Sequence, residues 1–332
     1  MRILFLTDDQ EDYLADSILH GLKTINQIEV VDYPRKDCLY AQYWKLCNKW
    51  GTNSIRGGGF TLYGKLDSNT WEIDRSQIKR KLESKYFDVV IIANIWRQWG
   101  LIIQWKKLLK DQHRLIILDG DDDPRDYQNS GAKIRAFGLY PTLHDLLTKN
   151  STNLFKRERR ASDRRNARNS NIHKISFSIP KEWTQKAQAI KTKLFQAHIV
   201  DQEIALILRK EHNTGYMFTD EQSYHQDLNV SRYGITTKRA GWDCLRHYEL
   251  AANGAIICFK DLDLKPKLCA PFDLVDGVNC LSYKNYNHLI DMISNIPQQR
   301  EEELRENTRE WARKSTTQIR AVKMLQDSGI DI

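Results

Sequence analysis

Cysteine is scarce in this chain, with six residues among 332. The six are widely separated, so they form neither the framework of a disulfide-stabilised domain nor a pair with the spacing of metal ligands. We therefore expect buried thiols in a protein of the reducing cytoplasm.

Long hydrophobic runs are also missing. The longest, such as residues 89–95 and 115–118, fall far below the ~18 apolar residues that a membrane-crossing helix needs. Met1-Arg2 leads directly into a short apolar run at residues 3–6, without the cleavage pattern of an export signal. These absences predict a cytoplasmic protein without a membrane span.

A dinucleotide-binding motif is lacking as well. The glycines at 57–59 follow no apolar strand and precede no amphipathic helix, so they favour a turn. The remaining composition, 41% hydrophobic and 28% charged, is that of an ordinary globular protein and excludes disorder, collagen and coiled coil. The length predicts about two domains.

Positive charge is concentrated in one segment. Residues 156–168 hold seven basic residues against Glu158 and Asp163, a net charge of +5 out of +8 for the chain. Such a cluster suits an anionic partner, for example a phosphate group or the anionic inner face of a membrane, although a solvated face is equally compatible. No motif of nucleic-acid recognition accompanies it, so no nucleic-acid partner is expected. The candidate phosphate patch consists of Lys156, Arg157, Arg159 and Arg160.

Short apolar runs alternate with amphipathic stretches in the first half of the chain. The predicted strands cover residues 3–6, 30–31, 87–92 and 115–118, and the predicted helices cover 14–25, 75–83 and 101–110. Nearly continuous apolar strands separated by helices indicate parallel pairing through crossovers. We expect a doubly wound, Rossmann-like α/β domain.

The second half repeats this alternation. A strand over 174–179 ends at Pro180 and would close the first domain. Gly254 is predicted to end a helix over 238–253 in the left-handed conformation. The other predicted strands cover 195–200, 216–218, 255–259 and 280–283, and the other predicted helices cover 201–208, the stretch from 289 onward and 301–324.

Three segments carry a family resemblance. Residues 249–257, Glu-Leu-Ala-Ala-Asn-Gly-Ala-Ile-Ile, resemble the Glu-Ala-x-Ala-x-Gly-x-Pro-Val block of B-type (GT-B) glycosyltransferases. Residues 274–281 resemble the Val-x-Asp-Gly-x-Asn-Gly turn of that family, and 287–290 resemble the helix that follows it. Residues 155–158, Phe-Lys-Arg-Glu, are similar to a segment of the CgeB-like, spore-maturation group.

The resemblance implies two Rossmann-like, doubly wound domains that face a cleft, with a closing C-terminal helix. We expect an acceptor-side domain over residues 1–180, a nucleotide-sugar-binding domain over 181–312, and a helix over 313–332 that packs back toward the first domain. The implied activity is transfer of a hexosyl group from a nucleotide-diphosphate sugar, the co-substrate, to a glycan, lipid-linked or protein acceptor.

The same block implies a donor site. Glu249 matches the family position that accepts the hydrogen bonds of a ribose diol, and Arg246 lies one turn earlier on the expected helix. Thr237, Lys238 and Arg239 are expected at the start of this helix, where backbone N–H groups and the dipole favour a diphosphate. Cations there would replace a metal ion, so neither a metal nor another cofactor is expected. Taken alone, Arg246 and Glu249 would be an ordinary surface pair.

One position departs from the family pattern. The family usually has an acidic residue eight positions before the position of Glu249, and this chain has Gly241 there. The identity of the sugar and the stereochemical outcome therefore stay open.

A catalytic base is expected from the first domain, because ligands of open α/β sheets lie beyond the carboxyl ends of the strands. Asp8, Asp9 and the aspartates of residues 119–123 follow predicted strands and are the candidates. Asp8 and Asp9 could instead cap the first helix. His225 and His247 are expected to be hydrogen-bonded rather than catalytic.

Two other functions fit parts of the sequence. Asp119-x-Asp121 after an apolar strand imitates the Asp-x-Asp of metal-dependent A-type glycosyltransferases, in which carboxylates hold Mg²⁺ or Mn²⁺. The basic segment 156–168 could serve a non-enzymatic protein that binds anions or nucleic acid. A phosphorelay receiver is excluded, because no strand ending in a phosphoacceptor aspartate occurs near residue 53.

Overall fold

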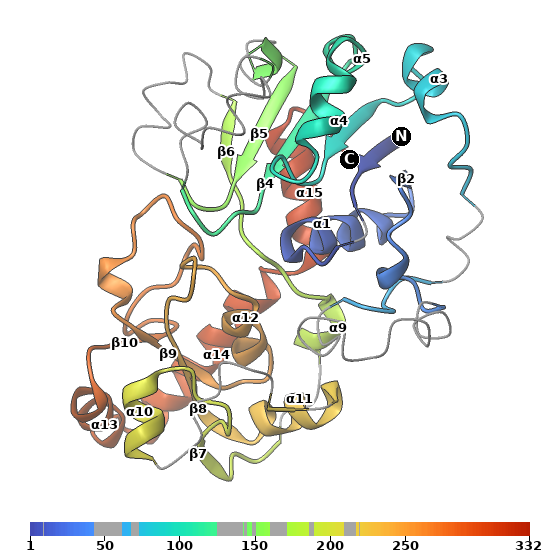
Figure 1. The fold of residues 1–332 in the computed structure, drawn as a ribbon. Coiled ribbons are helices and arrows are strands. Elements are labelled where there is room, and N and C mark those ends of the chain that lie inside the picture. Colours follow the sequence, from blue (N-terminus) through green and yellow to red (C-terminus); the bar gives the residue numbers. More distant parts are fainter. Residues whose placement is uncertain are drawn as a thin grey trace.

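The computed structural model describes residues 1–8, 10–42, 62–67, 73–124, 142, 145–147, 151–159, 171–185, 189–208, 217–218 and 220–332. Two parallel sheets organise these residues, one in the upper and one in the lower half of Figure 1. None of the described helices combines the length and the apolar composition that a bilayer crossing requires.

The N-terminal sheet has six parallel strands in the order β2-β1-β3-β4-β5-β6. They are β1 (Arg2–Leu6), β2 (Glu29–Tyr33), β3 (Val89–Ile92), β4 (Leu115–Asp119), β5 (Thr152–Lys156) and β6 (Ile172–Lys174). Ile3 and Phe5 pack on one face of this sheet, whereas Leu4 and Leu6 pack on the other. The doubly wound parallel sheet expected from the apolar strands is therefore confirmed.

Helices cover both faces of the N-terminal sheet. One face carries α1 (Tyr13–Lys23), and the other carries α3 (Ile78–Glu83), α4 (Trp99–Gln104) and α5 (Lys106–Lys110). A 3-10 turn, η1 (Asp37–Leu39), follows β2. The helix predicted over 101–110 is thus two short helices.

The strand predicted over 174–179 is wrong beyond its first residue. β6 ends at Lys174, and residues 175–179 form an extended linker between the two sheets. Ile179 pairs instead with Thr316, near the end of the chain. The apolar linker residues Ile175, Phe177 and Ile179 are buried between elements and do not extend the sheet.

The C-terminal sheet has four parallel strands in the order β10-β9-β8-β7. They are β7 (Lys193–Phe195), β8 (Ser231–Thr236), β9 (Ile256–Lys260) and β10 (Leu281–Tyr283). The helices around it are α9 (Lys181–Thr184), α10 (Gln202–Ile207), α11 (Glu221–Asn229), α12 (Leu245–Ala252), α13 (Tyr286–Ser294) and α14 (Gln298–Arg313), with a 3-10 turn, η6 (Leu262–Leu264). Asp201 caps α10 and Gly254 has a φ of 71°, both as expected.

The strand predicted over 216–218 is wrong. Met217 and Phe218 are not in a strand, and the strand of this region is β8, which follows α11. β8 contains Gly234, so it offers no continuous apolar run. A Cβ atom at Gly234 would lie 2.4 Å from a methyl carbon of Leu250, so the glycine lets α12 pack closely on β8.

The helix predicted over 238–253 is also too long. α12 begins at Leu245, and Cys244 precedes it in an extended conformation. Residues 237–244 form a loop, in which the Arg239 N–H donates to the Gly241 carbonyl at 3.0 Å. We call these residues the β8–α12 loop.

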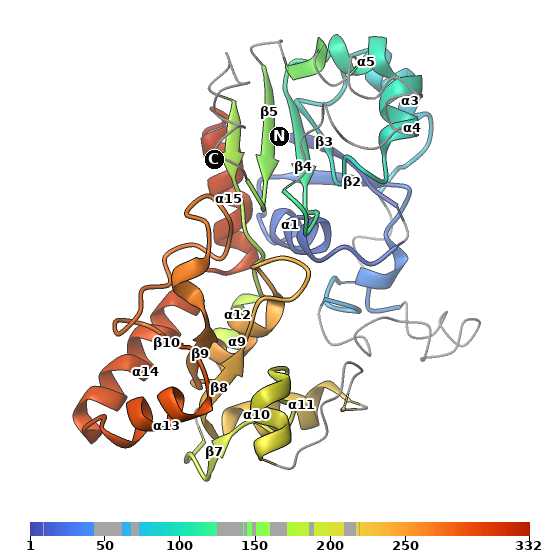
Figure 2. The ribbon, with the colours of Figure 1, turned by 60° about the vertical axis from the view of Figure 1, so that its left-hand side comes forward.

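The last helix, α15 (Thr317–Asp327), packs against α1 of the N-terminal half, as Figures 1 and 2 both show. His20 Nδ1 lies 2.9 Å from Thr317 Oγ1. A Cβ atom at Gly21 would come within 2.1 Å of the Thr317 carbonyl oxygen, so only glycine permits this approach. The chain therefore returns to its first domain after completing the second.

Candidate functional site

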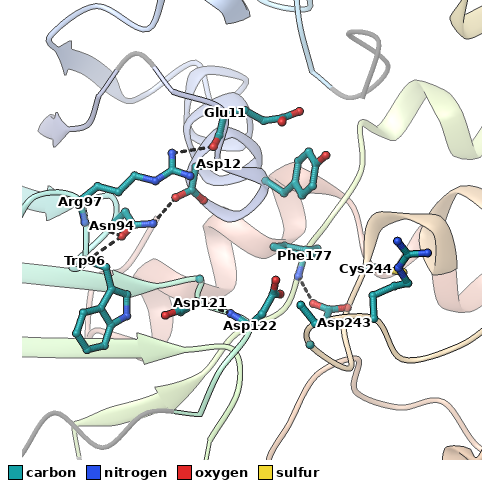
Figure 3. A pocket seen from close by; sticks show the side chains of 15 residues that line it. Glu11, Asp12, Asn94, Trp96, Arg97, Asp121, Asp122, Phe177, Asp243 and Cys244 are labelled. Atoms are coloured by element: carbon teal, nitrogen blue, oxygen red, sulfur yellow. Dashed lines mark hydrogen bonds between the residues drawn. The ribbon is translucent and has the colours of Figure 1, made fainter. Parts of the chain in front are cut away.

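A cleft of about 660 Å³ opens between the two halves of the molecule (Figure 3). Its N-terminal wall is formed by the segments that follow β1, β3 and β4, and its C-terminal wall by the β8–α12 loop. The linker contributes Phe177. The cleft thus lies beyond the carboxyl ends of strands from both sheets, where open α/β sheets bind ligands.

Asp12 is held firmly in the N-terminal wall. It caps α1, because its Oδ1 accepts the Ala15 N–H at 3.0 Å. Its Oδ2 accepts a hydrogen bond from Asn94 Nδ2 at 2.5 Å. Figure 3 shows Asp12 and Asn94 side by side at the cleft. Two donors therefore fix the carboxylate in one orientation, which suits a group that takes a proton from a ligand.

The aspartates proposed as catalytic lie in other places. Asp8 does not line the cleft; its Oδ1 accepts the Gln10 N–H at 2.9 Å and lies 3.6 Å from Arg97 Nη1. Asp9 lies outside the described residues. The alternative role of Asp8 as the cap of α1 is wrong, because Asp12 occupies that position.

Of the Asp119-x-Asp121 pair, Asp121 lines the cleft and Asp119 does not. Asp119 is buried, and its Oδ1 accepts hydrogen bonds from Trp96 Nε1 at 2.9 Å and from the Asp121 N–H at 3.2 Å. It therefore orients the cleft wall, whereas Asp121 and Asp122 line the cleft itself. Within the described ranges, no group of His, Cys, Asp and Glu is arranged to hold a metal ion.

The β8–α12 loop carries the cations of the C-terminal wall. Lys238 and Arg239 are exposed, and Thr237 is half-buried beside them. Arg239 lines the cleft, while Lys238 lines an adjoining cavity of about 480 Å³ and lies with its Nζ 5.8 Å from the Trp242 ring centre. The prediction that these residues begin a helix is wrong. They precede the amino end of α12, where Cys244 lines the cleft.

The basic patch predicted at residues 156–160 needs a correction. Lys156 and Arg157 are buried: Lys156 is the last residue of β5, which lies between β4 and β6, and Arg157 follows it directly. Arg159 is half-buried, and Arg160 lies outside the described residues. The prediction of four exposed cations is therefore wrong for Lys156 and Arg157. Phosphate binding by Arg159 and Arg160 stays a prediction.

Arg157 joins the two walls of the cleft. Its guanidinium pairs with Asp122 and donates to the carbonyls of Gly120 at 3.1 Å and Asp243 at 2.9 Å. It also stacks 4.3 Å from the ring centre of Phe177 in the linker. One buried cation thus contacts the N-terminal wall, the linker and the β8–α12 loop.

Glu158 holds the β8–α12 loop in place. Its Oε1 accepts the Trp242 N–H at 2.9 Å and lies 3.5 Å from Arg157 Nη1. A Cβ atom at Gly241 would lie 2.8 Å from this oxygen and 2.9 Å from Asp122 Oδ1. Gly241, which stands where the family pattern has an acidic residue, therefore packs closely against two carboxylates of the first domain.

Glu249 is buried in the second half of α12. Its Oε2 accepts a hydrogen bond from the Tyr224 hydroxyl at 2.5 Å. Burial raises the pKa of Glu249, and the bond from Tyr224 together with the charge of Arg246 opposes this shift. Arg246 Nη1 is buried without a hydrogen-bond partner among the described residues. Glu249 and Arg246 are not among the residues that line the cleft, and their role in donor binding stays a prediction.

Both histidines that the sequence singled out make hydrogen bonds. His225 Nδ1 lies 2.9 Å from Asn253 Nδ2. His247 Nε2 lies 3.0 Å from the Trp242 carbonyl, and burial lowers the pKa of His247 to about 4. Neither lines the cleft.

Several cleft residues escaped the sequence analysis. Asp12 lies six residues after the apolar run 3–6, and Asn94 and Trp96 lie within or directly after the apolar run 89–95, among residues typical of a core. The sequence offered one indication, namely that these residues follow predicted strands, and many other residues share that position. Asp243, whose carboxylate accepts from the Phe177 N–H at 2.8 Å, was assigned to a helix interior.

The fold is similar to those of solved structures. No protein-family model and no curated protein sequence matches the chain. HepE of Anabaena, solved in complex with UDP, superposes with a TM-score of 0.57 at 12% identity, covering 99% of this chain and 98% of its own. The complex of HepE with UDP-glucose gives a TM-score of 0.56 at 11% identity, with the same coverage of 99% and 98%.

A glycosyltransferase from Rickettsia africae is similar over a comparable extent. Its TM-score is 0.54 at 9% identity, covering 98% of this chain and 97% of its own. At such identities the likeness concerns the fold. The chain has the α/β fold with two parallel-sheet domains facing a cleft that the GT-B resemblance implied.

Proposed function

We propose that this protein is a glycosyltransferase that binds a nucleoside-diphosphate sugar in the cleft and transfers the sugar to a hydroxyl group. The observation that carries the proposal is the arrangement of charge across one cleft. Exposed cations of the β8–α12 loop face oriented carboxylates of the N-terminal wall, at the carboxyl ends of both sheets. The structural neighbours, a glycosyltransferase and a protein solved with UDP and UDP-glucose, support the same reaction.

The donor diphosphate is assigned to the C-terminal wall. Lys238, Arg239 and Thr237 offer positive charge and hydrogen-bond donors, and the N–H groups at the amino end of α12 add further donors. These groups stabilise the charge that develops on the departing nucleotide. Arg246 and Glu249, on the same helix, hold the nucleoside ribose.

The acceptor hydroxyl is assigned to the N-terminal wall. Asp12 is the base that receives its proton, since Asn94 and the Ala15 N–H orient the carboxylate. The proton passes to Asp12 as the hydroxyl oxygen bonds to the anomeric carbon and the bond from that carbon to the diphosphate breaks. A glycan, a lipid-linked or a protein hydroxyl satisfies this chemistry, and a CgeB-like relationship remains part of the proposal.

Transfer is proposed to need no metal ion. The cations of the β8–α12 loop and the dipole of α12 take the electrostatic part that Mg²⁺ plays in Asp-x-Asp enzymes. Sugar release in the presence of EDTA is expected to equal that without it. A loss of activity that added Mg²⁺ or Mn²⁺ restores would assign the diphosphate to a metal and contradict this part.

The donor is identified by thermal unfolding with UDP-glucose first and then with GDP-, CDP-, ADP- and dTDP-sugars. At a concentration of ~100 times the dissociation constant, the true donor stabilises the fold by roughly 2.7 kcal/mol. The double variant Lys238→Gln with Arg239→Gln is expected to lose most of this shift. The matched control is Lys79→Gln with Arg80→Gln, which removes the same charge from exposed positions on α3.

Two results of the thermal-unfolding measurements would contradict the proposal. If no nucleotide sugar stabilises the protein and none is hydrolysed or transferred, the cleft does not bind a donor. If stabilisation occurs but is equal in the two double variants, the β8–α12 loop is not the diphosphate site.

A further inference from the structure

A second concave surface lies at the joint of the two domains, apart from the cleft. It is a groove of about 190 Å³, and no residue lines both it and the cleft. Its walls come from β5 and β6, from the segment at Phe272 and Asp273, and from the helices α14 and α15. We call it the joint groove.

Cations dominate the lining of the joint groove. The groove is lined by four cations, Lys174, Lys314, Arg320 and Lys323, and by two carboxylates, Asp273 and Asp327. Lys323 pairs with Asp327 at 3.1 Å, and Lys314 pairs with Glu310 at 3.5 Å outside the groove. Lys174 and Arg320 have no ion-pair partner among the described residues. The four cations and two carboxylates that line the groove therefore carry a net charge of +2.

Arg320 carries an unmet hydrogen-bond donor. Its Nε is buried and has no acceptor within the part of the chain that the structure describes. Leaving a buried charged donor unpaired costs free energy, which an anion in the groove would recover. A guanidinium presents two parallel N–H groups, which match a phosphate or carboxylate.

The floor of the groove is aromatic and apolar. Lys174 Nζ lies 4.6 Å from the ring centre of Phe272, whose carbonyl accepts the Trp311 Nε1–H at 2.8 Å. Ile319 lines the groove and is 46% exposed. Beside its cations, the groove thus offers apolar surface for the uncharged part of a ligand.

We infer that the joint groove binds a phosphate monoester, with the phosphate between Lys174 and Arg320 and the esterified group over Phe272 and Ile319. A monoester is close to doubly charged at neutral pH, which matches the net charge of +2 of the groove lining. A soluble phosphorylated metabolite and the headgroup of a phosphatidic acid share this chemistry. The inference does not depend on the reaction in the cleft.

The test measures binding of two probes to the full chain. Inorganic phosphate is titrated with thermal unfolding as the readout, and vesicles of phosphatidylcholine with or without phosphatidic acid are used for co-sedimentation. The double variant Lys174→Gln with Arg320→Gln is expected to bind the effective probe at least about tenfold more weakly, because two charged partners are removed. Lys79→Gln with Arg80→Gln serves as the control for charge, and Lys238→Gln as the control for phosphate in the cleft.

The outcomes are distinct. Binding of free phosphate that only the groove variant loses supports the inference with a soluble ligand, and binding of phosphatidic acid alone supports it with a lipid headgroup. Equal binding by the groove variant and the wild type, or binding of neither probe by the wild type, overturns it. Should the double variant fail to fold, Lys174→Gln alone, at an exposed strand end, gives the same comparison.

Discussion

Asp12 serves the fold with one oxygen and faces the cleft with the other. Oδ1 accepts from the first turn of α1, and Oδ2 accepts from Asn94 in the opposite part of the wall. A substitution that removes both oxygens would mix a loss of stability with a loss of chemistry. Asparagine separates them, because it caps helices as well as aspartate does and cannot accept a proton.

Asp12→Asn is expected to lower kcat for sugar transfer by about 10²- to 10⁴-fold, the usual contribution of a general base. The free energy of unfolding should change by less than about 1 kcal/mol, since the cap is retained. Transfer kinetics and urea unfolding measure the two effects. Asp8→Asn, outside the cleft, is the control. A kcat within threefold of the wild type would remove Asp12 from the reaction.

Tyr224 positions Glu249 through the short hydrogen bond between them. Tyr224→Phe keeps the ring and removes this donor, so the carboxylate loses an interaction that favours its charged form. Donor binding is expected to weaken roughly fivefold, equivalent to about 1 kcal/mol for one hydrogen bond. Calorimetric titration with the donor measures it, and Tyr86→Phe on the surface is the control. Unchanged affinity would show that Glu249 does not contact the ligand.

At the scale of elements, the β8–α12 loop owes its shape to the first domain. Glu158 and Asp122 lie where a side chain at Gly241 would extend. Gly241→Ala is expected to displace the loop and to cost about 1–3 kcal/mol of stability, as overpacking usually does. Denaturant unfolding and donor titration measure the change.

The matched control for Gly241→Ala is Gly100→Ala in α4, where an added Cβ would meet no atom within 4 Å. Replacing glycine by alanine inside a helix gains up to about 1 kcal/mol. The two variants should therefore differ in sign. Similar stability of both would mean that Gly241 has room and that the loop does not depend on these carboxylates.

Prediction from the sequence succeeded where local residues determine an element and failed where contacts from distant residues determine it. Strands such as β1, β3 and β4 were predicted because their own apolar residues reveal burial on both faces. β8 was missed because Gly234 serves the packing of α12, which the strand itself does not show. The helix at Leu245 was placed too early, since the preceding residues are held as a loop by distant residues such as Glu158 and Arg157.

The residues of the candidate site were likewise predicted in part and missed in part. The cations of the β8–α12 loop were found by position before a recognisable block, whereas Asp12 was missed because the aspartates nearest the strand were favoured. Arg157 was taken as a surface charge within a basic segment. Its partners Asp122 and Asp243 are 35 and 86 residues away, so no local pattern could reveal that it is buried.

At the scale of the whole molecule, buried histidines make stability depend on pH. Burial lowers the pKa of His247 to about 4 from a usual 6.5, and it lowers the pKa values of His20 and His173 as well. Between these pH values the folded protein keeps His247 neutral while the unfolded chain binds a proton. The free energy of unfolding therefore falls as pH is lowered from 6.5 to 4.

For His247 the loss is on the order of 3 kcal/mol. Urea unfolding across this range should show a smaller acid-induced loss in His247→Gln than in the wild type, and no difference in the exposed control His113→Gln. Asp16, whose pKa burial raises to about 6, acts in the opposite direction and is unchanged in both variants. An identical pH dependence of the His247 variant and the wild type would contradict the assignment.

The return of α15 to α1 sets the order in which the protein can be completed during translation. Gly21 and His20 lie against Thr317, so a ribosome must synthesise the entire second domain before the first can close its surface. Until then the part of α1 that α15 covers in the complete protein lies open.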